Sequence, residues 1–195
     1  MADSLKAPLI LASASPRRLD LLRQVGIEPE RVQPAEVDES VLGSELPQAY
    51  ARRVAWAKLD AVAAGEKEAF VLAADTVVAL GRRILPKAEN VEEAERCLDL
   101  LSGRRHRVLG AICLQAPNGE RRHRLVTTQV SFKRLSAEET AAYLECGEWR
   151  GKAGGYAIQG RAAAFIPWIN GSYPNVVGLA VAETVGLLRG LGWRP

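Results

Sequence analysis

The chain has 195 residues, of which 48% are hydrophobic and 25% are charged. This balance is typical of a folded globular protein and excludes a chain that is disordered throughout. The longest apolar stretches, such as residues 70–80, are too short to span a bilayer, and Asp75 interrupts this one. The formal net charge of +3 is too small to indicate nucleic-acid binding by itself.

The cysteine and histidine content indicates a reduced compartment and no zinc cluster. The three cysteines form no C-x-x-C pair, and only two histidines are present. The apolar run at residues 8–12 is short, and Arg17 and Arg18 follow it at once, which is unlike a secretory signal. We therefore expect a cytoplasmic protein that binds neither a membrane nor, stably, nucleic acid.

Predicted helices and strands alternate along the chain. The first half predicts a buried strand, a helix that Ser15 and Pro16 begin, a second helix and a valine-rich central strand, over residues 9–12, 16–26, 47–64 and 70–80. The second half predicts a capping-box helix, a hairpin, another capping-box helix, a glycine-rich strand, a further strand and a last helix, over residues 90–102, 107–132, 136–146, 154–160, 165–169 and 179–191. The pattern indicates the α/β class with a mixed sheet. No linker or repeat divides the chain, so we expect one domain over residues 1–195.

Two arginines in the first turn of the first helix are the first chemical signal. Arg17 and Arg18 follow Ser15-Pro16, where the helix dipole disfavours cations. Their position is reasonable if an anion binds there, between backbone N–H groups and two guanidiniums. The alternative is that both side chains point into water.

The second signal is Asp75, an acid inside the most apolar predicted strand. A buried carboxylate is costly without a cation, a metal ion or an open strand end beside it. Both a functional acid and a structural salt bridge with a lysine satisfy this requirement. Lys58 continues an apolar row on the second helix, where extension of its amine into water is the ordinary explanation.

Glycine-rich and arginine-rich segments are less specific. Residues 151–160 match neither G-x-G-x-x-G nor a P-loop, and their glycines indicate either backbone close to a ligand or bulges. Within them, Gln159 can offer both a donor and an acceptor to a base. The arginine runs at 104–107 and 121–124 are expected at opposite ends of the hairpin, which favours a solvated basic surface over a nucleic-acid site.

Taken together, these segments resemble the Maf family of nucleoside triphosphate pyrophosphatases, also called septum-formation inhibitors. The resemblance spans almost the whole chain and rests on ordered motifs at residues 11–18, 74–78, 102–103, 151–160, 170–173 and 176–179. It implies an elongated, two-lobed fold like that of inosine triphosphate pyrophosphatases, with a mixed twisted sheet, flanking helices and a central cleft. It also implies a homodimer, and hydrolysis of a nucleoside triphosphate to the monophosphate and pyrophosphate with Mg²⁺ or Mn²⁺.

The resemblance also implies roles for individual residues. Asp75 matches the proton acceptor of the family, and with Glu39 it would hold the metal. Lys58 and Lys87 match further catalytic positions beside them. The matches to phosphate-binding residues are Ser13, Arg17 and Arg18.

Substrate preference follows from three further matches. Arg17, Thr76 and Gln159 match the positions that mark the dTTP/UTP branch, whereas the 7-methyl-GTP branch has tryptophan and glutamate at the first and third.

The sequence departs from the family at Ala88 and Ala180, where proline is usual. The resemblance links the activity with nucleotide-pool cleansing and cell-division arrest. The alternatives are a non-catalytic, nucleotide-responsive septation regulator and the same enzyme class acting on 7-methyl-GTP.

Overall fold

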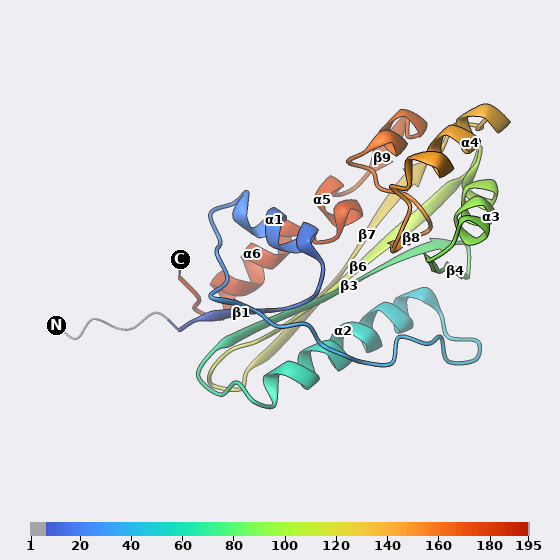
Figure 1. Cartoon of the computed structure of the whole chain (residues 1–195). Helices are drawn as coiled ribbons and strands as arrows, with labels where there is room; N and C mark the ends of the chain where they lie inside the picture. The colour runs from blue at the N-terminus through green and yellow to red at the C-terminus, as the bar shows by residue number, and fades with distance from the viewer. Residues whose placement is uncertain (1–6, 195) are drawn as a thin grey trace.

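One mixed sheet forms the centre of the computed structural model, which describes residues 7–194 (Figure 1). Its strand order is β2-β1-β3-β6-β7-β9, and β4 pairs with β3. The long strands are β3 (Phe70–Leu80), β6 (Arg105–Gln115) and β7 (Arg121–Ser131). The short ones in this sheet are β1 (Leu9–Ala12), β2 (Arg31–Val32), β4 (Arg83–Leu85) and β9 (Trp168–Asn170). Because β1 runs parallel to β3 while β3, β6 and β7 are antiparallel, the expected mixed α/β class is confirmed.

Helices cover both faces of the sheet. They are α1 (Pro16–Arg23), α2 (Pro47–Ala63), α3 (Val91–Leu101), α4 (Ala137–Cys146), α5 (Tyr173–Val177) and α6 (Val181–Gly190), with a 3-10 helix at Arg161–Phe165. In Figure 1, α2 lies below the long strands, α1, α5 and α6 lie above them, and α3 and α4 gather at the far end. The molecule is elongated along its long strands, as the resemblance implies (Figure 1).

The two faces of β3 belong to two hydrophobic cores. Val71, Ala73 and Val77 pack with α2, whereas Leu72 and Ala74 pack with the core on the opposite face. Successive side chains of a strand point to opposite faces, so burial on both faces explains the uninterrupted apolar run. By the same alternation, Asp75 faces α2, and its neighbour Thr76 faces α1 and α5.

The sequence predictions of local structure are wrong in part. The strand predicted over residues 165–169 begins only at Trp168, after a 3-10 helix that ends at Phe165. Residues 154–160 do not form a strand: β8 contains only Lys152–Ala153, and it pairs with β5 (Lys87–Ala88). Gly154 and Gly155 follow with φ of +69° and +68°, a left-handed backbone that no strand adopts. Ser15 is the N-cap of α1 and Pro16 its first residue, as predicted, although the Ser15 side chain makes no capping bond. Of the two predicted capping boxes, only the one at Ser136 is complete.

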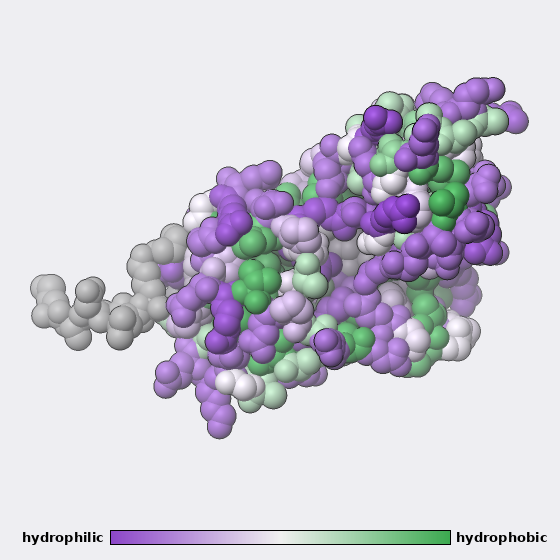
Figure 2. All heavy atoms as spheres, viewed as in Figure 1, coloured by the Kyte–Doolittle hydropathy of each residue, from purple (hydrophilic) through white to green (hydrophobic). Residues whose placement is uncertain are grey.

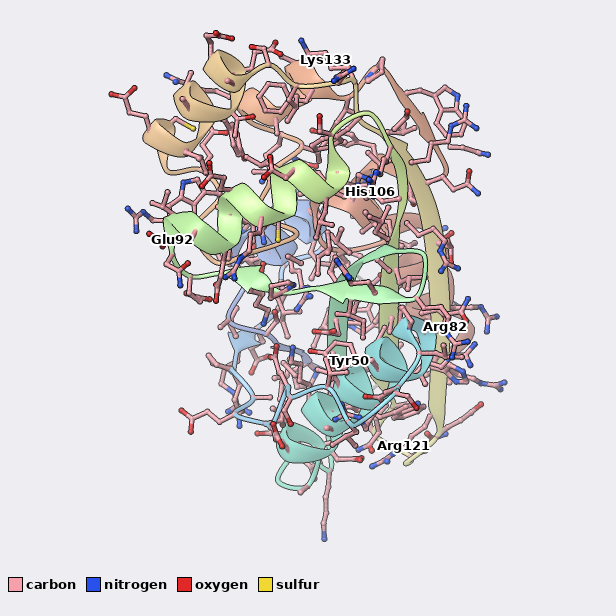
Figure 3. All side chains as sticks on the ribbon, turned by 90° about the vertical axis from the view of Figure 1, so that its right-hand side faces the viewer. Tyr50, Arg82, Glu92, His106, Arg121 and Lys133 are labelled. Carbon is pink, nitrogen blue, oxygen red and sulfur yellow. The ribbon has the colours of Figure 1, made fainter. Side chains whose placement is uncertain are left out.

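The two arginine-rich runs lie far apart on the hairpin, as predicted. Arg105 pairs with Ser131 at one end of β6, and Arg121 pairs with Gln115 beside the turn. Figure 3 shows Arg121 near the turn, with His106 toward the opposite end. The runs therefore form no single basic patch. Among residues 7–194, no helix is long and apolar enough to cross a membrane.

Buried His106 predicts a pH dependence of folding stability. His106 is 3% exposed, its Nε2 lies 2.8 Å from Tyr156 Oη, and its Nδ1 has no partner among the described residues. Burial lowers the pKa of His106 from 6.5 to about 4. Below pH 6.5, His106 therefore binds a proton in the unfolded chain, whereas in the folded protein it stays neutral until the pH falls to about 4. The free energy of unfolding therefore decreases as the pH falls from 6.5 through about 4.

Between pH 7 and pH 4, we expect the wild type to lose roughly 2–3 kcal/mol more unfolding free energy than His106→Gln loses. Urea denaturation across this range measures it, and His123→Gln, on the exposed part of β7, is the matched control. If the wild-type and His106→Gln curves run parallel from neutral to acidic pH, His106 does not provide this dependence.

Candidate active site

A cleft of about 380 Å³ opens between the β1–α1 segment, α2, β3, residues 150–159 and the α5–α6 junction. All the residues that the sequence predicted for the site line this cleft, namely Ser13, Arg17, Arg18, Glu39, Lys58, Asp75, Thr76, Lys87 and Gln159. An adjoining hollow of about 290 Å³ shares Glu39, Asp75, Thr76 and Lys87 and adds apolar side chains such as Val41. Hydrophilic side chains predominate over the visible face in Figure 2, with small separate hydrophobic patches.

An ion-pair cluster forms one wall of the cleft. Asp75 is 3% exposed, and its Oδ1 accepts a 2.8 Å hydrogen bond from Lys58 Nζ. The same Nζ lies 2.8 Å from Glu39 Oε1, and Lys87 contacts the other Glu39 oxygen. Lys58 does not extend into water, so the ordinary explanation for its position is wrong. The cluster balances two carboxylates with two ammonium groups.

Helix α2 holds the segment that carries Glu39 by its backbone, in addition to the ion pairs of the Glu39 side chain. Tyr50 Oη donates to the Glu39 carbonyl oxygen at 2.7 Å, and Arg53 donates to the carbonyl oxygen of Ser40 at 2.8 Å. Partial burial by itself raises the pKa of the Glu39 carboxyl, but hydrogen bonds from Lys58 and Lys87 outweigh it and lower this pKa. Burial, with the charges of Asp75 and Glu39, raises the pKa of Tyr50 to about 12. Glu39 is therefore held ionised and Tyr50 neutral near pH 7.

Arg18 connects three segments on the opposite face of β3. Its guanidinium donates to the Gly178 carbonyl oxygen at 2.9 Å, to Ser13 Oγ at 2.8 Å and to Thr76 Oγ1 at 3.2 Å. Thr76 Oγ1 itself donates to the Gly178 carbonyl oxygen at 3.1 Å. Burial lowers the pKa of Arg18, and the charges of Asp75 and Glu39 oppose that shift. Arg18 therefore positions the walls of the cleft, whichever contact it makes with a ligand.

Arg17 differs from Arg18, although the sequence suggested that the two act as a pair. Arg17 is half-buried in the cleft and makes no hydrogen bond or ion pair with the described side chains. Burial, and then the charge of Arg18, lowers the pKa of Arg17. Gln159 is exposed at the cleft and likewise has no partner among residues 7–194. These two side chains are available to a ligand in the present geometry.

Sequence reasoning missed several residues that line the cleft. Arg150 and Lys152 precede and follow Gly151, and Tyr156 follows the two left-handed glycines. Lys152 stood in the glycine-rich motif, where only Gln159 received a role. The signal that marks Lys152 is the pairing of β8 with β5, which brings it next to Lys87–Ala88, and this pairing is a tertiary contact.

A metal ion would have to share its ligands with a substrate. No group of three or more histidine, cysteine, aspartate or glutamate side chains capable of holding a metal occurs within residues 7–194. Asp75 and Glu39 approach one another through their common partner Lys58. One or two carboxylates plus phosphate oxygens is the usual way in which Mg²⁺ is held in nucleotide sites. The two carboxylates fit a metal that arrives with a phosphorylated ligand.

Known proteins similar to this chain agree with its sequence motifs and its fold. The family model for Maf-like proteins matches residues 8–191. A "dTTP/UTP pyrophosphatase" of Rhodospirillum rubrum is 61% identical, covering 96% of this chain and 90% of that protein. One of Paramagnetospirillum magneticum is 64% identical, covering 97% of this chain and 100% of that protein. A HAM1 protein from Coxiella burnetii, only 15% identical, aligns over 94% of this chain and 99% of its own with a TM-score of 0.51, which shows a shared fold alone. The chain belongs to the family of Maf-like proteins.

Proposed function

We propose that this protein hydrolyses dTTP and UTP to the nucleoside monophosphate and pyrophosphate. The observation that carries the proposal is the cleft itself, which the arginines of α1 line together with buried Asp75 and Lys58 and half-buried Glu39. Phosphoryl transfer needs a positioned water molecule and neutralisation of phosphate charge more than covalent help from the protein. The names of the similar proteins support the choice of dTTP and UTP.

In the proposed mechanism, Asp75 accepts the proton of a water molecule that attacks the α-phosphorus. A new bond forms between the water oxygen and the α-phosphorus, and the bond to the oxygen bridging to the β-phosphorus breaks, so pyrophosphate leaves. Lys58 orients the Asp75 carboxylate through the 2.8 Å hydrogen bond. Lys87 and Arg17 neutralise phosphate oxygens, and Ser13 and Arg18 shape the phosphate site.

A divalent cation such as Mg²⁺ or Mn²⁺ would be held by Asp75 and Glu39 together with the phosphates, and it would draw charge from the reacting phosphorus. Arg17, Thr76 and Gln159 select the pyrimidine nucleotide in this proposal.

The proposal further includes a homodimer and a cytoplasmic location. The first rests on the resemblance in sequence, and the second is supported by cysteines that remain free within the described residues.

Product analysis tests the proposed function. The purified protein is incubated with Mg²⁺ or Mn²⁺ and, separately, dTTP, UTP, CTP, dATP, GTP and 7-methyl-GTP. We expect pyrophosphate with dTMP or UMP, and no orthophosphate. Preferential cleavage of 7-methyl-GTP would contradict the roles of Arg17, Thr76 and Gln159 while keeping the enzyme class. Tight nucleotide binding without turnover would favour a nucleotide-responsive regulator instead.

A further inference from the structure

The basic side chains that line the cleft differ in their partners. Lys58 and Lys87 form ion pairs with the carboxylates of Asp75 and Glu39. Arg17 and Lys152 line the same cleft, and neither forms an ion pair with a carboxylate in the part of the chain that the structure describes. Cations that converge on a cavity without a carboxylate partner are suited to binding an anion. The cleft therefore holds cations that are paired with carboxylates and cations that are free to bind an anionic ligand.

The local fold holds Lys152 at the cleft. Gly151 precedes it with φ of +63°, and the Gly151 N–H donates to the Ala88 carbonyl oxygen at 2.8 Å. Two residues after Lys152, the Gly154 N–H donates to the Pro86 carbonyl oxygen at 2.9 Å. These bonds flank the short β5–β8 ladder and fix the backbone of Lys152 against the segment that carries Lys87.

The surroundings of the Lys152 ammonium group are suited to binding a phosphate. Lys152 is half-buried, and its Nζ donates one hydrogen bond, to the Arg150 carbonyl oxygen at 3.0 Å. An ammonium group has three donors, so two are available to a ligand. Burial, and then the charge of Arg17, lowers the pKa of Lys152, and the charge of Glu148, which forms no ion pair with it, opposes this shift. An anion between these two cations would relieve their mutual repulsion.

We propose that Lys152 is a substrate-binding residue which, together with Arg17, binds the β- and γ-phosphates that leave as pyrophosphate. This inference rests on the proposed function. Water attack is assigned to Asp75, and Lys87, which is paired with Glu39, is assigned to the oxygens of the reacting α-phosphate. Two other arginines line the cleft, but Arg18 already donates to Ser13, Thr76 and Gly178, and Arg150 lies over the Trp149 ring. Lys152 and Arg17 are therefore the cations available to the departing end of the triphosphate. The assignment gives residues 150–153 a direct part in substrate binding that their glycine content did not indicate.

Kinetics of Lys152→Gln test the assignment. Loss of one charged hydrogen bond is expected to raise both the KM for dTTP and the inhibition constant of pyrophosphate about tenfold, with kcat within about threefold of wild type. The inhibition constant of dTMP, which lacks the two terminal phosphates, is expected to stay unchanged. Lys152→Arg, which keeps the charge, is expected to restore pyrophosphate inhibition to within about threefold.

Controls separate this role from a structural one and from the proposed function. Lys67→Gln removes a charge from an exposed residue between α2 and β3 and leaves all constants unchanged. Lys152→Met, which keeps the aliphatic chain, is the second charge-removing variant if Lys152→Gln folds poorly. Equal weakening of dTMP and pyrophosphate, or no weakening of either, would overturn the assignment. Should the wild type hydrolyse no nucleotide, the proposed function fails, and calorimetric binding of inorganic pyrophosphate to wild type and Lys152→Gln still tests Lys152.

Discussion

Asp75→Asn is expected to lower kcat for dTTP hydrolysis about a thousandfold while KM changes less than about threefold. The amide cannot accept the proton of the attacking water, but its oxygen can still accept the hydrogen bond from Lys58, which Asp75 Oδ1 accepts at 2.8 Å in the wild type. Lys58 also keeps its contact with Glu39, so it is not left buried without an anion. Steady-state kinetics of pyrophosphate release measure the effect.

The control for Asp75→Asn is Asp60→Asn, a change of the same kind on the exposed side of α2. Asp60 forms an ion pair with Arg121 at the surface, and its loss is expected to leave kcat unchanged. Thermal denaturation must show both variants folded. Near-normal turnover by folded Asp75→Asn would remove Asp75 from the role of proton acceptor. Overexpression of the wild type and of inactive Asp75→Asn tests the link with cell division that the resemblance implies. Equal arrest by both would show that such an effect does not need hydrolysis.

Much of the framework around Asp75 was predictable from local pattern. The apolar run of β3 and the turn between β6 and β7 predicted the long strands, because periodicity and turn residues act over short distances. The alternation of β3 also explains why Asp75 and Thr76 serve opposite faces of the sheet. These features need no knowledge of how distant segments pack.

The partners of the site residues could not be predicted in this way. Lys58 is 17 residues from Asp75, and Arg18 is 160 residues from Gly178, so their contacts depend on the packing of separate elements. A lysine at the surface and one buried against a carboxylate have the same apolar neighbours along a helix. The glycine motif misled the strand prediction for a related reason, since the left-handed turn at Gly154 and Gly155 depends on packing against Val78 and Ala94.

Lys58→Met is expected to cause the largest loss of folding stability, about 3–5 kcal/mol at neutral pH. Methionine fills the space of the aliphatic chain, but Asp75, which is 3% exposed, is left with no cation at its carboxylate. Burying an unpaired charge costs far more than the net stabilisation that an ion pair provides. Urea denaturation at pH 7 measures the loss.

A double variant shows whether the loss comes from charge or from packing. Adding Asp75→Asn to Lys58→Met removes the unpaired charge, and we expect it to recover about half of the lost unfolding free energy. In the wild type, where the charge is paired, we expect Asp75→Asn to give no gain in stability. Lys67→Met, at an exposed position, is the control for replacing lysine by methionine. If Lys58→Met is as stable as this control, Asp75 obtains its charge balance elsewhere, and Lys58 acts on the substrate alone. If the loss is large but Asp75→Asn recovers none of it, the cost lies in the packing of α2 against β3. Recovery by Asp75→Asn would establish that the ion pair between Lys58 and the proposed proton acceptor stabilises the fold.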